Sequence, residues 1–342
     1  MSDIIKIKKG FDIKISGKAI EKVSSPMVSS YALKPTDYIG ITPKLLVKEG
    51  DRVKAGSPVF YSKLNEKILF TSSVSGTIES IQRGDKRAIE EIIILADSTQ
   101  EYEDFGTDSL ASMQRENVVE KLLKSGLWTL IRQRPYSTIP NSEVQPKCII
   151  VKGFDSSPLG ADYNFLLKGK GTDLQLGVDV LRKLTSGKIH VNISATQTTC
   201  DELLRLENVQ INRFEGPHPS GNVSVQIANI DPINKGDIIW YIDAQDLAIV
   251  GKLFASGKLE MQKTIALVGP EVKNPQYFSV RFGACVSSIV ENNVNTDKNL
   301  RYISGNILTG ISISANGYIG TYDNLISVIE EGDYYEFLGW IT

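Results

Sequence analysis

The chain opens with apolar and charged residues in alternation. Two runs with a two-residue period, IIKI at 4–7 and FDIKI at 11–15, flank Lys8, Lys9 and Gly10. Such alternation on both sides of a glycine predicts a β-hairpin. The following segment, residues 24–38, mixes prolines, small polar residues and aromatics without a regular period. We therefore expect it to be a surface loop that displays aromatic side chains.

From residue 41 the pattern changes to short strands separated by glycine turns. Two strand–turn–strand halves, residues 47–59 and 70–78, resemble the barrel-sandwich fold of biotinyl and lipoyl carrier domains. The connection at 62–67 contains Lys63 and Lys67, but it lacks the flanking pattern of an acylated lysine. We expect a structural module here rather than a carrier.

A helix is predicted after the acidic linker that follows the barrel-sandwich. Ser112 is a suitable N-cap and Gly126 is a suitable stop. The apolar positions between them share one helical face: Val118, Val119, Leu122 and Leu123. Beyond this helix, three runs rich in β-branched residues, 148–152, 188–193 and 209–214, alternate with helical patterns. Strands that alternate with helices predict an open parallel sheet, on which ligands bind beyond the carboxyl ends of the strands.

The last part of the chain returns to short strands. Residues 269–290 resemble a β-grasp module in which two strands lead into a short helix. The expected fold is therefore multidomain, α/β and β, with a barrel-sandwich, a Rossmann-like parallel sheet and a β-grasp (SLBB-like, ubiquitin-like) domain. The predicted segments are 1–32 (hairpin and loop), 33–97 (barrel-sandwich), 98–257 (Rossmann-like) and 258–342 (β-grasp).

Composition narrows the classes of function. Lys and Arg total 38 against 40 Asp and Glu, so the net charge of −2 creates no global field for nucleic acid or an anionic membrane. Any such partner would need a local patch. The three cysteines are far apart without a CxxC motif, which argues for reduced thiols and against iron–sulfur ligation, and two histidines are few for a zinc or haem site. No uninterrupted apolar run is long enough to span a bilayer.

The joint between the predicted helix and the sheet is SGLWTLIRQRPYSTIP, residues 125–140. In α/β enzymes such a joint often carries several glycines whose backbone amides bind a phosphate. Here it carries only Gly126, and cations, aromatics and prolines occupy the rest. The glycine cradle for a nucleotide is therefore not intact.

The order of modules, together with SGLWTLIRQRPYSTIP, GPHPSGN, ALVGPEVKNP, ISGNILTG and EFLGW, resembles the NqrA subunit of the Na+-translocating NADH:quinone reductase. The resemblance covers the whole chain, and the helical region that normally ends members of that family is expected to be absent. More distantly, the chain is similar to the electron-input subunit of the Rnf complex and to the flavin subunit of complex I. Those relatives have a glycine-rich joint that binds FMN and NADH, whereas this chain has Trp128, Leu130 and Ile131 among the corresponding positions. The resemblance therefore implies that neither FMN nor NADH binds here.

The resemblance also implies a cellular location, a set of cofactors in partner subunits and a set of partners. We expect a peripheral subunit on the cytoplasmic face of the bacterial inner membrane, inactive alone, which reaches the membrane only through its complex. It would hold no redox cofactor itself, and FMN, FAD, riboflavin and the iron–sulfur centre are expected in partner subunits. The partners would be other subunits of the complex, chiefly NqrB, with ubiquinone as a candidate ligand and no nucleic acid.

Two interpretations of the joint remain open. Trp128, Ile131 and Tyr136 can flank a flat quinone ring, while Arg132 and Arg134 can donate hydrogen bonds to its carbonyls. Alternatively the joint packs on NqrB, because arginine and aromatic residues are enriched at protein interfaces as well.

Two further candidates lie outside the joint. Tyr31 belongs to the aromatic segment at 24–38 and carries the same ambiguity. His218, between two prolines in GPHPSGN, can titrate near neutral pH and is a candidate proton donor to a reduced quinone, although a structural role fits it as well.

Overall fold

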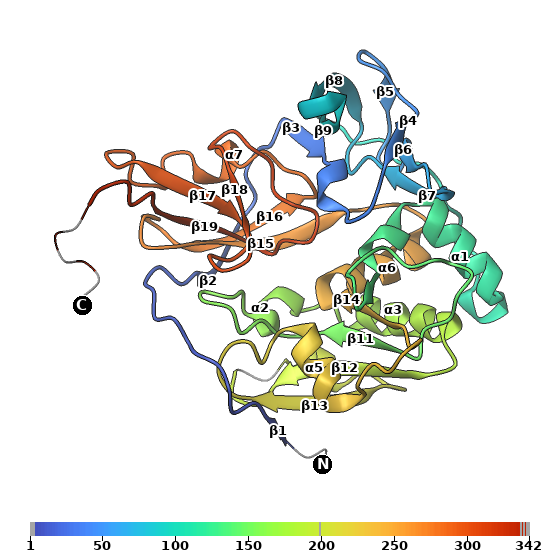
Figure 1. Cartoon of the computed structure of the whole chain (residues 1–342). Coiled ribbons are helices and arrows are strands. Elements are labelled where there is room, and N and C mark those ends of the chain that lie inside the picture. The colour runs from blue at the N-terminus through green and yellow to red at the C-terminus, as the bar shows by residue number, and fades with distance from the viewer. Residues whose placement is uncertain (1–3, 198–199, 336, 338, 340–342) are drawn as a thin grey trace.

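The computed structural model describes residues 4–197, 200–335, 337 and 339. Its three domains meet at a central junction (Figure 1). The barrel-sandwich, the α/β domain and the β-grasp domain occur in the predicted order along the chain. Among the residues with described structure, no helix has both the length and the apolar character needed to cross a bilayer.

The N-terminal segment, residues 4–24, runs along the outside of two domains, and we call it the N-terminal strap (Figure 1). Strand β1 (Ile4–Lys6) pairs in parallel with β13 (Gln210–Glu215) of the α/β sheet, and β2 (Ile20–Ser24) pairs in parallel with β16 (Gln276–Arg281) of the β-grasp sheet. The predicted hairpin is therefore wrong. The alternating pattern does indicate an extended chain, but the strap takes its hydrogen-bond partners from the edges of two existing sheets.

The barrel-sandwich consists of a four-stranded and a three-stranded sheet. The first contains β3 (Ser30–Leu33), β9 (Ile89–Ala96), β8 (Gly76–Arg83) and β5 (Arg52–Val53), and the second contains β4 (Pro43–Leu45), β6 (Pro58–Ser62) and β7 (Asn65–Thr71). Because β3 pairs with β9, residues 24–38 are not simply a surface loop. Part of this segment is a sheet strand that continues into the 3₁₀ turn η1 (Pro35–Asp37).

Helix α1 (Arg115–Lys124) leads from the barrel-sandwich towards the α/β sheet. Its N-cap is Gln114, whose backbone amide donates to Asn117 Oδ1 at 3.2 Å, and not the predicted Ser112, which lies in the preceding turn η3 (Leu110–Ser112). Gly126 ends the helix as predicted, with a left-handed φ of 78°. The chain then forms the short 3₁₀ helix η4 (Leu127–Leu130).

The α/β sheet has the order β1-β13-β12-β11-β14-β10. Its strands after β1 are β10 (Arg132–Arg134), β11 (Cys148–Lys152), β12 (Lys188–Ser194), β13 and β14 (Ile239–Asp243), and its helices are α2 (Tyr163–Leu167), α3 (Gly171–Leu184), α4 (Asp201–Leu204), α5 (Val223–Ile230) and α6 (Ala244–Ser256). All strands are parallel except β10. The chain builds outward from β11 to β13 and then returns to place β14 on the other side of β11. The topological switch point, where such folds bind ligands, therefore lies between β11 and β14.

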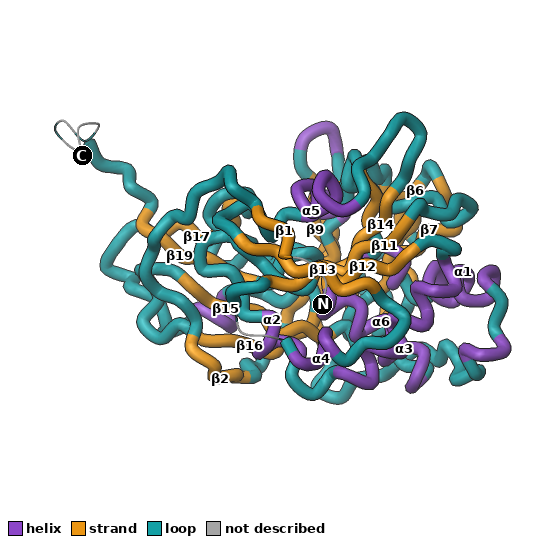
Figure 2. The backbone as a smooth tube through the Cα atoms, turned by 90° about the horizontal axis from the view of Figure 1, so that it is seen from below, coloured by secondary structure: helices purple, strands orange, loops and turns teal. Residues whose placement is uncertain are grey.

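The two faces of this sheet are covered unequally. Helices α3, α4 and α6 lie on one side and α5 on the other (Figure 2). A separate small apolar cluster under α5 contains Ile150, Val223, Ile227 and Tyr241. The side chains of β14 are nevertheless mostly buried, on both faces, whereas those of β10, at the edge of the sheet, are all partly buried.

The β-grasp sheet has the order β18-β17-β19-β15-β16-β2. Its strands are β15 (Gln262–Val268), β16, β17 (Leu300–Ser304), β18 (Ile311–Ile313) and β19 (Leu325–Glu330), and its short helix is α7 (Ser287–Val290). The last strand pairs in parallel with the first, so it lies in the middle of the sheet. This arrangement confirms the predicted β-grasp, to which the N-terminal strap adds one strand.

A buried polar cluster ties the three domains together. Lys263 in β15 forms an ion pair with Asp246 in α6 at 2.9 Å, and both side chains are at most 4% exposed. The Lys263 ammonium also donates to the carbonyl of Thr321 at 2.9 Å, and the Thr321 amide donates to Asp37 in η1 at 2.8 Å. We call Asp37, Asp246, Lys263 and Thr321 the junction cluster.

Candidate functional site

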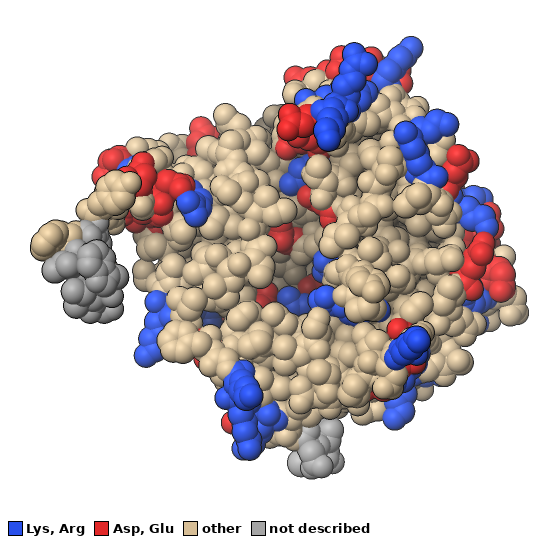
Figure 3. Space-filling view, in the orientation of Figure 1, with Lys and Arg blue, Asp and Glu red and all other residues tan. Residues whose placement is uncertain are grey.

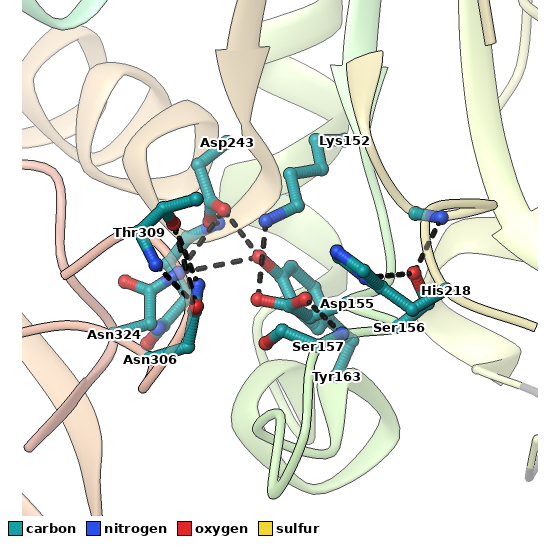
Figure 4. Close-up of polar contacts among 12 residues, drawn as sticks. Lys152, Asp155, Ser156, Ser157, Tyr163, His218, Asp243, Asn306, Thr309 and Asn324 are labelled. Carbon is teal, nitrogen blue, oxygen red and sulfur yellow. Dashed lines mark hydrogen bonds and ion pairs between the residues drawn. The ribbon is translucent and has the colours of Figure 1, made fainter. Parts of the chain in front are cut away.

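The crevice at the switch point is bounded by the last residues of two strands. Lys152 ends β11 and Asp243 ends β14, and the register places them side by side. Figure 3 shows a hollow at the centre of this face of the molecule, where acidic and basic side chains gather between the α/β and β-grasp domains. We call Lys152, Asp155, Tyr163, Asp243 and Asn324 the crevice cluster (Figure 4).

An ion pair occupies one side of the crevice. The Lys152 ammonium lies 3.3 Å from Asp155 Oδ2, and the Ser157 amide donates to Asp155 Oδ1 at 2.8 Å. Burial by itself disfavours the charged lysine, but the carboxylates of Asp155 and Asp243 outweigh it and raise the pKa of Lys152. Burial likewise disfavours the charged Asp155, but the Lys152 charge and the hydrogen bonds from Ser157 hold its pKa below the usual value. Both groups are therefore charged at neutral pH.

A second group of hydrogen bonds occupies the other side. Asp243 caps α6 through the Gln245 amide at 2.9 Å, accepts a hydrogen bond from the Tyr163 hydroxyl and accepts another from Asn324 Nδ2 at 3.0 Å. Burial, with the negative charges of Asp243 and Asp155, raises the pKa of Tyr163 well above its ordinary value. Asn324 belongs to the β-grasp domain, so this contact also holds two domains together.

The crevice cluster bears on nucleotide binding. Its two carboxylates, Asp155 and Asp243, lie where the fold would seat a phosphate, and like charge there is unfavourable. The only ammonium in the cluster, Lys152, is already paired with Asp155. The crevice residues therefore do not fit a dinucleotide or flavin phosphate in this arrangement.

The joint places two of its predicted site residues in the core. Trp128 and Ile131 are both 0% exposed. The indole of Trp128 packs edge-on against Trp240 at 5.3 Å between ring centroids and donates to the Pro140 carbonyl at 2.9 Å. In this structure neither side chain is available to flank a ligand, because both fill the space under the sheet.

The two arginines of the joint lie on the α5 face of the sheet, at its edge, and both are partly buried. Strand β10 pairs with β14 so that Arg132 is opposite Tyr241. The Arg132 guanidinium carbon lies 4.7 Å from the ring centroid of Tyr241 and 4.0 Å from that of Tyr322, and the Arg134 carbon lies 5.2 Å from the Tyr241 ring. Among the described residues, neither arginine has a carboxylate at ion-pair distance, and Arg134 Nε is buried without a hydrogen-bond partner.

Tyr136 lies in the turn that follows the two arginines. It is 76% exposed and follows a cis peptide bond between Arg134 and Pro135. The neighbouring Ser137 hydroxyl lies 2.6 Å from the Tyr241 hydroxyl, which fixes the turn against β14. The structure thus brings Arg132 and Arg134 together with the rings of Tyr241 and Tyr322, while Tyr136 is exposed in the turn that follows them.

The other two candidates lie elsewhere. Tyr31 is 7% exposed in β3, where it bridges to Ala284 of the β-grasp domain, so its expected place on a surface loop is wrong. His218 is half-buried, and its Nδ1 lies 3.0 Å from Ser156 Oγ while its amide donates to Asp12 at 2.8 Å. The first contact holds the GPHPSGN turn to the loop after β11 and the second holds it to the N-terminal strap, and a role in proton transfer stays a prediction.

Sequence reasoning missed the aromatic partners of the arginines. Tyr241 stands two residues before the end of a strand, a signal that could have placed it beside the switch point. Tyr322 comes from the β-grasp domain, and no local pattern connects it to the joint. Among the described residues, no group of three His, Cys, Asp or Glu side chains is arranged to hold a metal ion.

Comparison with known families follows the three domains. Residues 5–97 match the NqrA N-terminal barrel-sandwich hybrid domain, residues 113–259 the NqrA second alpha/beta domain, and residues 264–315 the NQRA C-terminal domain. The chain is 38% identical to the NqrA subunit of the Na(+)-translocating NADH-quinone reductase of Neisseria meningitidis serogroup A, over 99% of this chain and 76% of that protein. The chain belongs to the NqrA family.

Other NqrA proteins give the same picture. Identity is 36% to the NqrA protein of Yersinia pseudotuberculosis, over 99% of this chain and 76% of that protein, and 35% to that of Rhodopirellula baltica, over 98% and 75%. NqrA proteins are named as subunits of an oxidoreductase complex, the Na+-translocating NADH-quinone reductase. A solved NAD+-reducing [NiFe]-hydrogenase matches more distantly, at 11% identity over 68% of this chain and 52% of that chain with a TM-score of 0.44, and no argument rests on it.

Proposed function

We propose that this NqrA-family chain is a peripheral subunit of the Na+-translocating NADH:quinone reductase that holds no redox cofactor and helps to form or cover the quinone-binding region. In this proposal it docks on the membrane subunit NqrB at the cytoplasmic face, and the complex couples NADH oxidation and ubiquinone reduction to Na+ export. The single observation that carries the proposal is the filled crevice at the switch point.

The crevice argues against a flavin site of its own. A phosphate there would meet the carboxylates of Asp155 and Asp243 and would have to break the Lys152–Asp155 ion pair. The glycine cradle is also missing, and Trp128, which lies in the corresponding part of the joint, is buried in the core. Retention of stoichiometric FMN by the natively produced protein, or NADH oxidation by the isolated chain, would contradict this part of the proposal.

The arginine pair supports contact with a quinone. Arg132 and Arg134 are free of carboxylate partners among the described residues, so their N–H groups can donate to a neutral carbonyl without first breaking an ion pair. Tyr136, 76% exposed in the same joint, provides flat apolar surface, while the buried Tyr241 ring packs against both guanidinium groups. An aromatic ring with carbonyl groups matches this combination of stacking surface and donors.

The test is calorimetric titration of a short-chain ubiquinone analogue into the isolated chain. We expect saturable binding that Arg132→Ala and Arg134→Ala each weaken about tenfold or more, since a charge-assisted hydrogen bond contributes about 1.5–3 kcal/mol. Arg83→Ala, on the exposed rim of the barrel-sandwich, is the matched control and should bind as the unmodified chain does. Thermal unfolding of each variant separates loss of binding from loss of folding.

An alternative function is purely structural docking without substrate contact. One observation favours it: a groove of about 520 Å³ between α1 and β7 has Leu69, Val119 and Leu123 among its lining residues and charged side chains at its rim. Grooves of this kind accept partner segments. No saturable quinone binding, together with loss of complex assembly in a Leu123→Glu variant that still folds, would favour docking over the quinone proposal.

A further inference from the structure

The N-terminal strap concentrates positive charge on a chain that is acidic overall. The chain carries a net charge of −2, yet residues 4–24 contain six lysines and only two acidic residues. The lysines are Lys6, Lys8, Lys9, Lys14, Lys18 and Lys22. Figure 3 shows basic side chains along the edge of the molecule where Figure 1 places the strap. This is the kind of local patch that the overall composition lacks.

Most of this charge is not neutralised within the chain. Lys6 forms an exposed ion pair with Glu215 at 3.8 Å. The other five strap lysines have no carboxylate at ion-pair distance among the described residues, and all are exposed. Of the acidic residues, Asp12 is used to accept the hydrogen bond from the His218 amide, and Glu21 is exposed. The strap therefore presents a net positive stripe to its surroundings.

Large apolar side chains stand among the lysines. Phe11 is 77% exposed, Ile20 61% and Ile13 41%, which is unusual exposure for neighbouring residues of this size. The segment that carries these side chains is not a flexible tail, because backbone hydrogen bonds fix the strap to both domains. Phe11 N donates to the His218 carbonyl at 2.9 Å, Ile20 N donates to the Pro275 carbonyl at 3.1 Å, and β1 and β2 pair with both sheets.

We propose that the N-terminal strap binds an anionic lipid surface. Its lysines would face the negatively charged headgroups, and Phe11 and Ile13 would enter the interfacial region, the combination by which peripheral proteins bind membranes. The form of the strap favours a bilayer over a compact partner, since an extended segment of this length spans up to roughly 70 Å. The inference goes beyond the proposed function, in which the chain reaches the membrane only through protein partners, and it does not depend on quinone binding.

The test is sedimentation of the isolated chain with vesicles of phosphatidylcholine alone or with about 30% phosphatidylglycerol, at low and high salt. We expect binding to the anionic vesicles only, and weaker binding at high salt. Lys8→Ala/Lys9→Ala should weaken it by about tenfold or more, because each lysine near an anionic surface contributes a several-fold factor. Lys188→Ala/Lys235→Ala removes the same charge from exposed positions outside the strap and should leave binding unchanged.

Replacing Phe11 by Ser tests the apolar contribution, with an expected loss of several-fold at constant charge. Equal binding to neutral vesicles, no binding to either kind, or normal binding by Lys8→Ala/Lys9→Ala would overturn the proposal. If vesicles do not bind but the same double variant fails to assemble with the partner subunits, the strap is a protein-docking surface instead. Quinone titration needs no membrane, so failure of the lipid proposal and failure of the proposed function are distinguishable.

Discussion

The buried pair of Lys263 and Asp246 offers a direct test of how the domains are held together. It joins β15 of the β-grasp domain to α6 of the α/β domain, and the side chains are 4% and 2% exposed. The lysine also donates to the Thr321 carbonyl and lies 4.4 Å from the ring centroid of Phe282. Removing either partner leaves the other charge in a site from which water is excluded.

The expected loss of stability follows from this burial of an unpaired charge. Breaking a buried pair by removing one partner typically costs about 3–5 kcal/mol, whereas replacing both partners by apolar residues of similar size is often neutral. We therefore expect Asp246→Leu and Lys263→Met each to lower stability by about 3–5 kcal/mol, and the double variant to be within about 1–2 kcal/mol of the unmodified chain. For domains of this size, about 1 kcal/mol shifts the melting temperature by roughly 2–4 °C, so each single variant should melt about 6–20 °C lower.

Calorimetric unfolding of the four proteins measures the coupling, and hydrogen exchange of α6 and β15 amides shows whether the loss is local to the contact. The exposed pair of Lys124 and Glu120 on α1, at 2.7 Å, is the control, for which we expect effects below about 1 kcal/mol. Additive single-variant effects without rescue in the double variant would refute the reasoning. So would a Lys263→Met variant that unfolds like the unmodified chain.

The same pair has a defined pH signature. Burial raises the pKa of Asp246 to about 6, although the Lys263 charge acts in the opposite direction. In the unfolded chain an aspartate has a pKa of about 3.9. Between about pH 4 and pH 6 the folded state therefore binds more protons than the unfolded state, and the contribution of Asp246 to stability falls as the pH rises. Asp246→Asn removes the titration. The free energy of unfolding of the unmodified chain, taken relative to that of this variant, should therefore fall as the pH rises from about 4 to about 7.

Two further predictions concern the joint and the crevice. Gly126→Ala should destabilise the chain by about 2–4 kcal/mol, because the residue has a left-handed φ and its new Cβ would lie 2.4 Å from Thr71 Oγ1. Gly169 has the same φ of 78° but open space around it, so Gly169→Ala should cost only about 1 kcal/mol, and equal melting temperatures of the two variants would contradict the close approach. Asp243→Ala removes a helix cap and the acceptor of the Tyr163 hydroxyl, with an expected loss of about 2–4 kcal/mol by chemical denaturation, while Asp243→Asn keeps the cap and should lose less.

Most of the domain structure can be predicted from the sequence, because local patterns determine it. The β-branched runs at 148–152, 188–193 and 209–214 are β11, β12 and β13 to within one residue, and their parallel pairing follows from the helices between them. Gly126 ends α1 because a left-handed residue there requires no side chain. In each case the deciding interaction is local or joins strands that follow one another in the sheet, such as Cys148 with Lys188 and His190 with Gln210.

The errors arise where the partner is distant in sequence. The apolar alternation of the strap is correct for an extended chain, but its hydrogen-bond acceptors are the Glu215 and His218 carbonyls, more than 200 residues away. Tyr31 looked like a loop residue because polar neighbours and prolines surround it, yet β9 and Ala284 bury it. Periodicity shows that a residue is in a strand, and it does not show which sheet takes the strand.

The candidate site likewise has features that the sequence predicts and features that depend on distant partners. The sequence indicates that the glycine cradle is missing, but it does not distinguish Trp128, which the core absorbs, from Arg132, four residues later, which reaches the α5 side of the sheet. That distinction depends on the 3₁₀ helix η4 and on the pairing of β10 with β14, which together turn Trp128 to Trp240 and Arg132 to Tyr241.

The crevice and the arginines also differ in what holds their side chains in place. In the crevice, the carboxylates of Asp155 and Asp243 are held by Lys152, Tyr163 and Asn324 from two domains. The arginine face lies on the neighbouring strand and shares no ion pair or hydrogen bond with that cluster among the described contacts. A variant of the crevice, such as Asp243→Asn, should therefore alter stability while leaving quinone binding unchanged, and Arg134→Ala should do the reverse. If both substitutions changed binding in parallel, the two regions would form one site, and the crevice could no longer be regarded as filled only for structural reasons.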